Sequence, residues 1–500
     1  MNNPPSCTVY FAIVTIYTFS NCSKINIEVL PPNRSEENRI HSLVRIFAEH
    51  IRLHGIHALR KESVQDPISF CSRKFVNGRQ AGCGNFGNSV YQYFSGFLYS
   101  VILNRTFFVV DSISCENSTL FTRPWIPTYS DITSLYKASK CDETRLGDPR
   151  GFYVLPQFYN SSYIVGSSFD YSCFMDRVDS LNLAFFHSEL IPYKIFYDKE
   201  NLALGDSAKA KVLAIFSNTV EHDAFFESMG FAFHFTIGFS EEVHSVVHDL
   251  LSSLFPSGHG HSLGSGKYHE MNAELDNSGG TSMTPDSAAT ERQLKSIQRL
   301  CVSYPPNTIT IAMHVRHFNK ESRSNPELDI ELDRNFTIRL KEVLTEKFNG
   351  LHCRLLLASD RRESILRLRS DATALGCDVL TVPRGDLNRT ENITDCFMEN
   401  KWNGLCLEQG PWRKGAMQMA DLVFLSHAQY FIGTGTSTYS NTIAYLLSLR
   451  RAACYNNWMP SPIDYVSGAK EWRNMTFYLL HSNPLIVPCP AEAVKRLSLS

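Results

Sequence analysis

The stretch NTITIAMHVRHFNK, residues 307–320, is the segment from which the fold class can be read. Its first half places Ile309, Ile311 and Met313 at alternate positions, which is the pattern of a strand with a buried face. The apolar run then gives way to four potential cations: His314, Arg316, His317 and Lys320. A core strand that ends in cations predicts either an anionic ligand at the end of the sheet or a solvated strand end with unrelated charges.

Strands and helices alternate in the sequence beyond residue 300. We expect strands at 308–315, 353–359, 378–383 and 429–433, and helices at 328–348, 362–375, 412–427 and 439–450. This order predicts an α/β fold with a mostly parallel sheet covered on both faces. Such sheets bind ligands outside the carboxyl ends of their strands. His314, Arg316, Asp360 and Thr434 all fall at or just past expected strand ends, so we expect them near one site.

The size and charge of the chain limit its class. Five hundred residues exceed one ordinary core, so we expect two domains of roughly 200 residues each. Hydrophobic residues make up 43% and charged residues 20%, which is typical of a globular protein. A net charge of −2 argues against a nucleic-acid partner bound through bulk positive charge. The basic cluster at 314–320 therefore serves a local anion.

The N-terminus and the glycosylation sequons indicate the secretory pathway, and we expect the Golgi. Residues 1–23 carry no charge, and their apolar core at 9–19 is short for a membrane-spanning helix. This pattern favours a signal peptide or a membrane signal anchor over a buried strand or an incomplete gene model. Nine Asn-x-Ser/Thr sequons indicate a glycosylated, lumenal protein. They begin at Asn21, Asn33, Asn104, Asn117, Asn160, Asn335, Asn388, Asn392 and Asn474.

The fourteen cysteines form no Cys-x-x-Cys motif, so zinc and redox motifs are not expected. In a lumenal protein, scattered cysteines predict structural disulfides. Cys396 and Cys406 bracket a short loop and form a plausible local pair. The other pairings stay open at the level of sequence.

We divide the chain into five parts by composition. They are residues 1–23, the signal peptide or anchor; 24–70, a stem with an amphipathic helix at 39–54; 71–254, an N-terminal domain; 255–290, a low-complexity insertion or linker; and 291–500, a C-terminal domain. The linker is rich in Gly and Ser, and its His259 and His261 are better explained as solvated side chains than as metal ligands.

The segment FIGTGTSTYSNTIAYL, residues 431–446, predicts an anion site. A strand ends near Gly433, small residues follow, and a helix begins. A helix N-terminus offers backbone N–H groups and a positive dipole end, both of which suit phosphate. Ser437, Thr438 and Ser440 could add hydroxyl bonds. The alternative is an ordinary helix-capping turn.

The segment AGCGNFGN, residues 81–88, matches G-x-G-x-x-G, and Asp111 follows at the end of an expected strand. This pattern is typical of a dinucleotide site when a strand precedes it. The residues before it, SRKFVNGRQ, form a poor strand, and the lumenal signals suit an NAD-type oxidoreductase badly. That function stays an alternative.

Two carboxylates are expected to be buried. Asp360 ends an apolar strand and Asp421 lies on an apolar helix. A buried carboxylate needs a partner, which could be a guanine edge, a structural Arg or a helix N-terminus. No Asp-x-Asp motif is present. The start of a charged helix explains Asp329, Glu331 and Asp333, so no metal is expected.

Together these segments resemble the α1,2/α1,6/O-fucosyltransferase superfamily. GCGNFGN with YQYFSGFLYSVILNRTFFV is similar to the family's glycine loop, helix and strand; MHVRHFNK resembles its first motif, and QMADLVFLSHAQYFIGTGTSTYSNTIAYL its last. The resemblance covers about half the chain, mainly 77–112 and 307–450. It implies a GT-B fold, with two Rossmann-like domains and an active site in the cleft between them. It also implies GDP-fucose as donor and no required metal or other cofactor.

Carried over by motif, the resemblance assigns roles to individual residues. Arg316 would hold the diphosphate, His314 and Asp421 would contact guanine, and Ser437 and Thr438 would bond phosphate oxygens. The donor-site residues that we expect are His314, Arg316, Lys320, Asp421, Thr436, Ser437, Thr438, Gly84 and Asn85.

The chain departs from the α1,6 branch of the family at two positions. His317 stands where that branch has a second Arg, and Asn319 stands where it has Asp. The catalytic base is therefore open, and Glu321 and Glu327 are candidates beside Arg316. We expect an inverting fucosyltransferase acting on a glycan or glycoprotein. The alternatives are a lumenal glycosyltransferase that uses another nucleotide sugar and a catalytically silent, glycan-binding relative.

Overall fold

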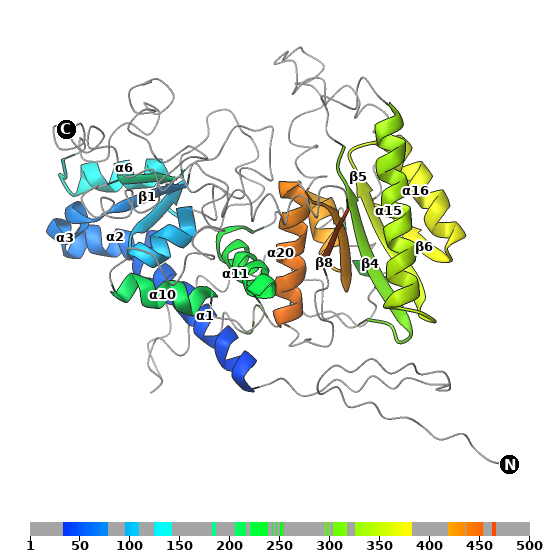
Figure 1. Cartoon of the computed structure of the whole chain (residues 1–500). Coiled ribbons are helices and arrows are strands. Elements are labelled where there is room, and N and C mark those ends of the chain that lie inside the picture. The colour runs from blue at the N-terminus through cyan, green and yellow to red at the C-terminus, as the bar shows by residue number, and fades with distance from the viewer. Residues whose placement is uncertain are drawn as a thin grey trace, which may run out of the picture.

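In the computed structural model the chain forms two parallel β-sheets with helices packed around them (Figure 1). The structure describes residues 34–78, 96–109, 125–142, 183–186, 206–216, 221–238, 304–317, 326–382, 419–435, 437–453 and 463–466, with single positions between 243 and 300. The α/β class with parallel sheets, expected from the alternation of elements, is confirmed.

The first sheet has three strands in the order β2-β1-β3, all parallel. Its central strand β1 (Phe75–Gly78) pairs with β2 (Thr106–Val109) and β3 (Leu183–Phe186). We expected no good strand before the glycine loop, and this was wrong. Only Phe75 and Val76 of β1 are large apolar residues, and both are buried. Two apolar residues are too few to give a periodic signal.

Helices surround this sheet. They are α1 (Arg34–His54), α2 (Ile56–Gln65), α3 (Pro67–Ser72), the helical segment 96–103, α6 (Tyr129–Ala138), α10 (Asp206–Phe216) and α11 (Glu221–Thr236). The amphipathic helix expected at 39–54 is confirmed within α1. Its apolar stripe is buried, and the ring of Phe47 lies 5.5 Å from that of Phe97 and 5.4 Å from that of Phe235. This helix therefore contributes to the core, whereas we had placed it in a stem.

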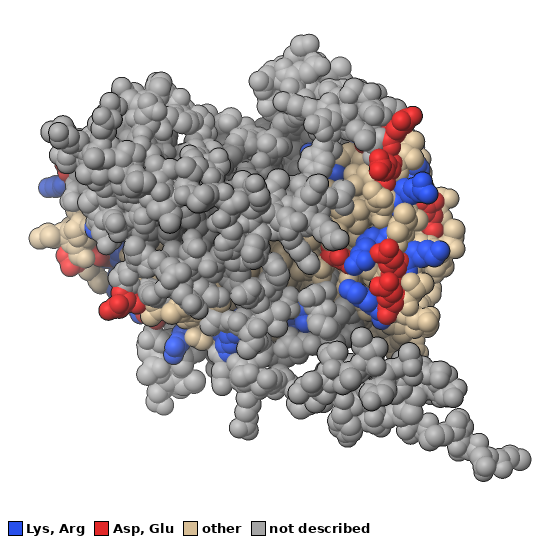
Figure 2. Space-filling model, in the orientation of Figure 1, with Lys and Arg blue, Asp and Glu red and all other residues tan. Residues whose placement is uncertain are grey.

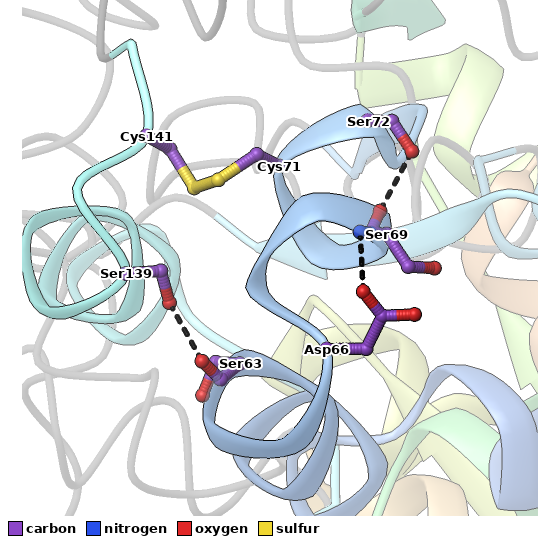
Figure 3. The surroundings of a disulfide bond; sticks show 7 residues. All are labelled: Ser63, Asp66, Ser69, Cys71, Ser72, Ser139 and Cys141. Carbon is purple, nitrogen blue, oxygen red and sulfur yellow. Dashed lines mark hydrogen bonds between the residues drawn. A yellow bond between two sulfur atoms is a disulfide. The ribbon is translucent and has the colours of Figure 1, made fainter.

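A disulfide joins α3 to the segment after α6, and side-chain hydrogen bonds cap α3 and connect α6 to α2 (Figure 3). Cys71, near the end of α3, is joined to Cys141, which follows α6. Asp66 caps α3 by accepting a hydrogen bond from the Ser69 N–H at 3.1 Å. The Ser139 hydroxyl donates to the Ser63 carbonyl at 3.1 Å, which ties the end of α6 to α2. These contacts hold the outer helices of the first sheet together.

The second sheet has five parallel strands in the order β6-β5-β4-β7-β8. The strands are β4 (Thr308–Val315), β5 (His352–Ser359), β6 (Cys377–Leu380), β7 (Tyr430–Thr434) and β8 (Ile463–Val466). The helices are α15 (Pro326–Glu346), α16 (Arg362–Ala374), the helical segment 419–425 and α20 (Thr438–Ala453). The expected strands and helices are confirmed, apart from shifts at their ends and from residues 412–418 of the helix expected at 412–427, which lie outside the described part of the chain. β8 was not foreseen.

The strand order reverses at β4. The chain adds β5 and β6 on one side of β4, and then β7 and β8 on the other side. The carboxyl ends of β4 and β7 therefore mark the switch point of the sheet. Ligands of open α/β sheets bind at such a point.

One hydrophobic cluster joins the helices of the first sheet to the second sheet. It includes Phe47 and Phe97 from the first part of the chain and Phe431 and Tyr445 from the second. Helices α11 and α20 pack side by side between the sheets (Figure 1). They approach each other closely at Gly230, where a Cβ atom would lie 2.3 Å from the Tyr445 carbonyl oxygen. The absence of a side chain at Gly230 thus permits this helix pair.

A second disulfide joins Cys353 of β5 to Cys377 of β6, which are register partners in the sheet. Both cysteines are buried. The two disulfides agree with the expectation of structural cystines, whereas the Cys396–Cys406 pair lies outside the described residues. The segments 1–23 and 255–290 lie outside them as well. Among the helices that the structure describes, none is long and apolar enough to cross a membrane.

Candidate functional site

The candidate site begins where β4 and β7 end. His314 is the register partner of Gly433, and Arg316 follows directly after β4. The Thr434 hydroxyl accepts a hydrogen bond from the Arg316 N–H at 2.9 Å and donates one to the His314 carbonyl at 3.3 Å. The end of β7 thereby fixes the backbone from which the Arg316 side chain projects.

The turn between β7 and α20 is closed by Ser437. Its N–H donates to the Thr434 carbonyl at 3.0 Å, and its hydroxyl accepts from the Ser440 N–H at 3.2 Å. Ser437 is therefore the N-cap of α20. The capping turn is confirmed, and it places the first turn of a 16-residue helix at the switch point. The anion site expected in this segment stays a prediction.

His314 is built into the same corner. Its Nδ1 lies 2.7 Å from the Ser440 hydroxyl, and its ring packs on that of Tyr439 with the centroids 4.8 Å apart. The Ser440 oxygen also accepts a hydrogen bond from the Thr434 N–H at 3.2 Å, so its own proton is available for His314 Nδ1. When the Ser440 hydroxyl donates to Nδ1, a neutral His314 ring carries its proton on Nε2. Only 6% of His314 is exposed.

Arg316 forms an ion pair with Asp360, the residue that follows β5. Its guanidinium lies 2.9 Å from Asp360 Oδ2, and 40% of its side chain remains exposed. Burial alone would raise the pKa of Asp360, but the hydrogen bond from His317 and the charge of Arg316 hold that pKa below its usual range. The ion pair uses one nitrogen of a group that carries five N–H donors, so Arg316 can still bind an anion.

His317 lies behind Asp360 and is buried. Its Nδ1 and its backbone N–H both lie 3.1 Å from Asp360 Oδ1. Its Nε2 lies 3.0 Å from the Ser364 hydroxyl and 3.3 Å from Asp333 Oδ1. Burial lowers the pKa of His317, but the bonds to Asp333 and Asp360 outweigh burial and raise it to about 9. His317 is therefore an imidazolium at neutral pH.

The acidic start of α15 has a structural role that the sequence reading missed. Asp333 is buried and accepts bonds from the Arg367 Nε and NH2 groups at 2.8 and 2.6 Å. Asp329, one turn earlier, is also buried and pairs with Arg361. We had explained these residues as a charged helix start. Their i, i+4 spacing, which puts both on one face of α15, was the signal that could have revealed a paired face.

The remaining candidates are described in full, in part, or not at all by the structure. Asp421 lies on the helical segment before β7 and is 8% exposed, and Glu327 is exposed in the first turn of α15. Thr438 begins α20, but its side chain lies outside the described part of the chain. The candidates that lie wholly outside it are Lys320, Glu321, Thr436, Gly84 and Asn85. Of the expected site residues, the structure thus brings together His314, Arg316 and Ser437.

The positive charge at the switch point comes from a few groups and not from a broad basic surface. Figure 2 shows acidic and basic side chains interspersed over the helices that cover the second sheet. The switch point itself combines the Arg316 charge with the positive end of α20. Within the described residues, no group of three or more His, Cys, Asp or Glu side chains could hold a metal ion. What the arrangement offers chemically is a small anion site with a charged, partly exposed guanidinium.

Comparison with known proteins gave distant structural similarity alone. No family model and no curated protein matches the chain. Among solved structures, a mutant of Arabidopsis thaliana FUT1 in complex with GDP is 10% identical, with a TM-score of 0.43; the match covers 82% of this chain and 76% of that one. The fucosyltransferase NodZ from Bradyrhizobium is 14% identical, with a TM-score of 0.34, over 74% of this chain and 92% of that one. At these scores the functional argument rests on the residues of this chain.

Proposed function

We propose that this protein is an inverting, metal-independent fucosyltransferase that moves fucose from GDP-fucose to a glycan or glycoprotein acceptor. The observation that carries the proposal is that Arg316, which follows β4, is bonded through its backbone N–H to Thr434 at the end of β7, the neighbouring strand that leads to the N-terminus of α20. The identity of the donor comes from the sequence motifs at 314–320 and 417–446. The same motifs support a GT-B arrangement, with the active site between the two domains.

In the proposed reaction the acceptor hydroxyl attacks the anomeric carbon of fucose, and the bond from that carbon to the diphosphate oxygen breaks. Negative charge grows on the GDP diphosphate as it leaves. Arg316 and the first turn of α20 would stabilise that charge, and they are held in place before the donor binds. Pre-organised donors of this kind lower the barrier because they need no rearrangement during the reaction.

The acceptor hydroxyl must lose its proton, and a carboxylate is the expected base. Asp360 is a poor choice, because its ion pair and hydrogen bonds lower its pKa and occupy both of its oxygens. Glu321 and Glu327 remain the candidates. Glu327 lies in the first turn of α15 and is exposed to solvent.

The guanine end of the donor is assigned to His314 and Asp421. His314 supports this role through its Nε2 proton and through the neighbouring ring of Tyr439, next to which a base could stack. A carboxylate such as Asp421 matches the N–H edge of guanine. We further propose that the protein works in the lumen of the secretory pathway, in the Golgi, with residues 1–23 as its signal peptide or anchor.

The test is a comparison of donors and of two arginine variants. GDP-fucose, GDP-mannose, UDP-sugars and NAD are each offered with a glycan array, and binding of GDP is measured by calorimetry. Arg316→Ala should lose most of the GDP affinity and of the fucose transfer. Arg369→Ala, an exposed arginine on α16, is the matched control and should retain both.

Three outcomes would overturn the proposal. Full GDP-fucose turnover by Arg316→Ala would exclude the role of the guanidinium. Transfer from a UDP-sugar would assign a different donor, and reduction of NAD would identify an oxidoreductase. Tight GDP binding without transfer to any glycan would identify a silent relative.

A further inference from the structure

The cluster behind Arg316 contains more charge than a single ion pair needs. Arg316, His317 and Arg367 supply three cations, and Asp333 and Asp360 supply two carboxylates. With His317 protonated, the cluster keeps one net positive charge. That charge can reach a ligand through Arg316, whose side chain is 40% exposed, while the side chains of His317 and Asp333 are almost fully buried.

Asp360 is held from both sides. Its Oδ1 accepts the backbone N–H and lies 3.1 Å from Nδ1 of His317, which leaves Oδ2 for the Arg316 guanidinium at 2.9 Å. A rotation of the carboxylate would break these contacts together. The orientation of Asp360 thus depends on the His317 ring, and the position of the Arg316 guanidinium depends on Asp360.

The His317 ring is itself fixed from the other face. Asp333 on α15 and Ser364 on α16 both lie beside its Nε2. A neutral ring carries one N–H, so it would leave either Asp333 or Asp360 facing a lone pair. With both ring nitrogens protonated, His317 presents an N–H to Asp360 through Nδ1 and a second N–H to Asp333 and the Ser364 hydroxyl through Nε2.

We propose that His317 is a positioning residue for Arg316: as a doubly protonated ring between Asp333 and Asp360, it turns Asp360 so that the Arg316 guanidinium faces the anion site at the end of β4. The inference rests on the proposed function in naming GDP as the anion. It goes beyond that function because it assigns the residue that sets the geometry of the site. His317 does not touch the donor in this scheme.

The test is a double-mutant cycle with GDP as the probe. His317→Gln should weaken GDP binding roughly tenfold, the size expected for a misplaced charge-assisted hydrogen bond. In an Arg316→Ala background the same substitution should change GDP affinity little, because its effect passes through Arg316. Equal losses in both backgrounds would overturn the proposal.

A matched control separates positioning from loss of a buried histidine. His427 is also buried, and it precedes the amino end of β7, whereas the candidate site lies at the carboxyl end of that strand. His427→Gln should lower the melting temperature without changing GDP affinity. If it weakens GDP binding as much as His317→Gln, the effect of His317 is general destabilisation and the proposal fails.

Asp333→Asn provides a second variant with a pH readout. The charged and polar groups that face His317 are Asp333 from α15, Asp360 after β5 and Ser364 from α16, with Arg367 bound to Asp333. GDP affinity should fall at alkaline pH, where His317 loses its second ring proton. Removing the Asp333 charge should move this loss to lower pH. An unchanged pH profile would contradict the assignment.

A ligand-free measurement distinguishes failure of this inference from failure of the proposed function. The side-chain NMR signal of Arg316 in arginine-labelled protein should shift in His317→Gln. If that signal shifts while the wild type binds no GDP, His317 positions Arg316 and the proposed donor is wrong. If Arg316→Ala weakens GDP binding while His317→Gln changes neither the signal nor the affinity, the donor site stands and the positioning role is overturned.

Discussion

The protonated His317 ring connects β4 with β5 and with α15, the helix that packs beside them. The imidazolium contacts Asp360 after β5 and Asp333 on α15, and its backbone follows β4. The sequence could place His317 at the end of a strand, but it could not place Asp333 or Asp360 beside it. Those contacts span 16 and 43 positions, so they come from the packing of α15 and β5 on β4. The residue that looked like a departure from the family therefore has a structural reason to be charged.

Stability should fall as the pH rises through the titration of His317. Its pKa is raised from 6.5 to about 9 in the folded protein, so its stabilising effect is full below pH 6.5 and is lost as the pH approaches 9. The expected loss is on the order of 3 kcal/mol. Urea unfolding at several pH values measures it. His317→Gln should flatten the pH dependence over this range, and an equally steep dependence in the variant would contradict the assignment.

Ser440 connects His314 to the start of α20. Its hydroxyl lies 2.7 Å from His314 Nδ1 and accepts from the Thr434 N–H. Ser440→Ala leaves these two buried groups without that partner and should cost about 1–3 kcal/mol of unfolding free energy. Ser448→Ala, at a buried serine two turns further along α20, is the control and should cost less. Similar losses in the two variants, measured by urea unfolding, would show that the Ser440 network is not special.

At the scale of elements, the apolar pattern decided what the sequence could predict. The eight-residue strands β4 and β5 have clear apolar patterns and lie where we expected them. The four-residue strand β6 was also predicted, whereas β1 and β8, which have the same length, were missed. The strand ends that carry the site were predicted from the alternation of strands and helices along the sequence. The residues at these ends are His314, Arg316, Asp360 and Thr434. The order of the strands, and with it the switch point, required the structure.

The packing of α11 on α20 gives a prediction for Gly230. A Cβ at this position would lie 2.3 Å from the Tyr445 carbonyl oxygen and 2.8 Å from Leu449 Cβ. The nearer atom belongs to the backbone, so Gly230→Ala must separate the helices and should cost roughly 1–3 kcal/mol. Thermal unfolding measures the loss. Unchanged stability in Gly230→Ala would show that the two helices can move apart at no cost and would contradict this account.

At the scale of the whole molecule, the two disulfides act on different lengths of chain. Cys71–Cys141 encloses 70 positions and Cys353–Cys377 encloses 24. By chain entropy, the longer loop should contribute about 1 kcal/mol more to stability. Replacing each pair by serine and measuring urea unfolding tests this order. A larger loss for the Cys353–Cys377 pair would show that packing between β5 and β6 outweighs loop length.

The shared hydrophobic cluster predicts how the chain unfolds. Its residues come from both sheets, and α11 and α20 contribute adjoining faces. Disrupting either half therefore exposes apolar surface of the other, which couples their stabilities. Calorimetry should show one main transition, and Gly230→Ala should move that whole transition to lower temperature. GDP, which binds at the second sheet in our proposal, should raise the same transition. Two separate transitions, with GDP raising only one, would show that the halves fold independently despite their common core.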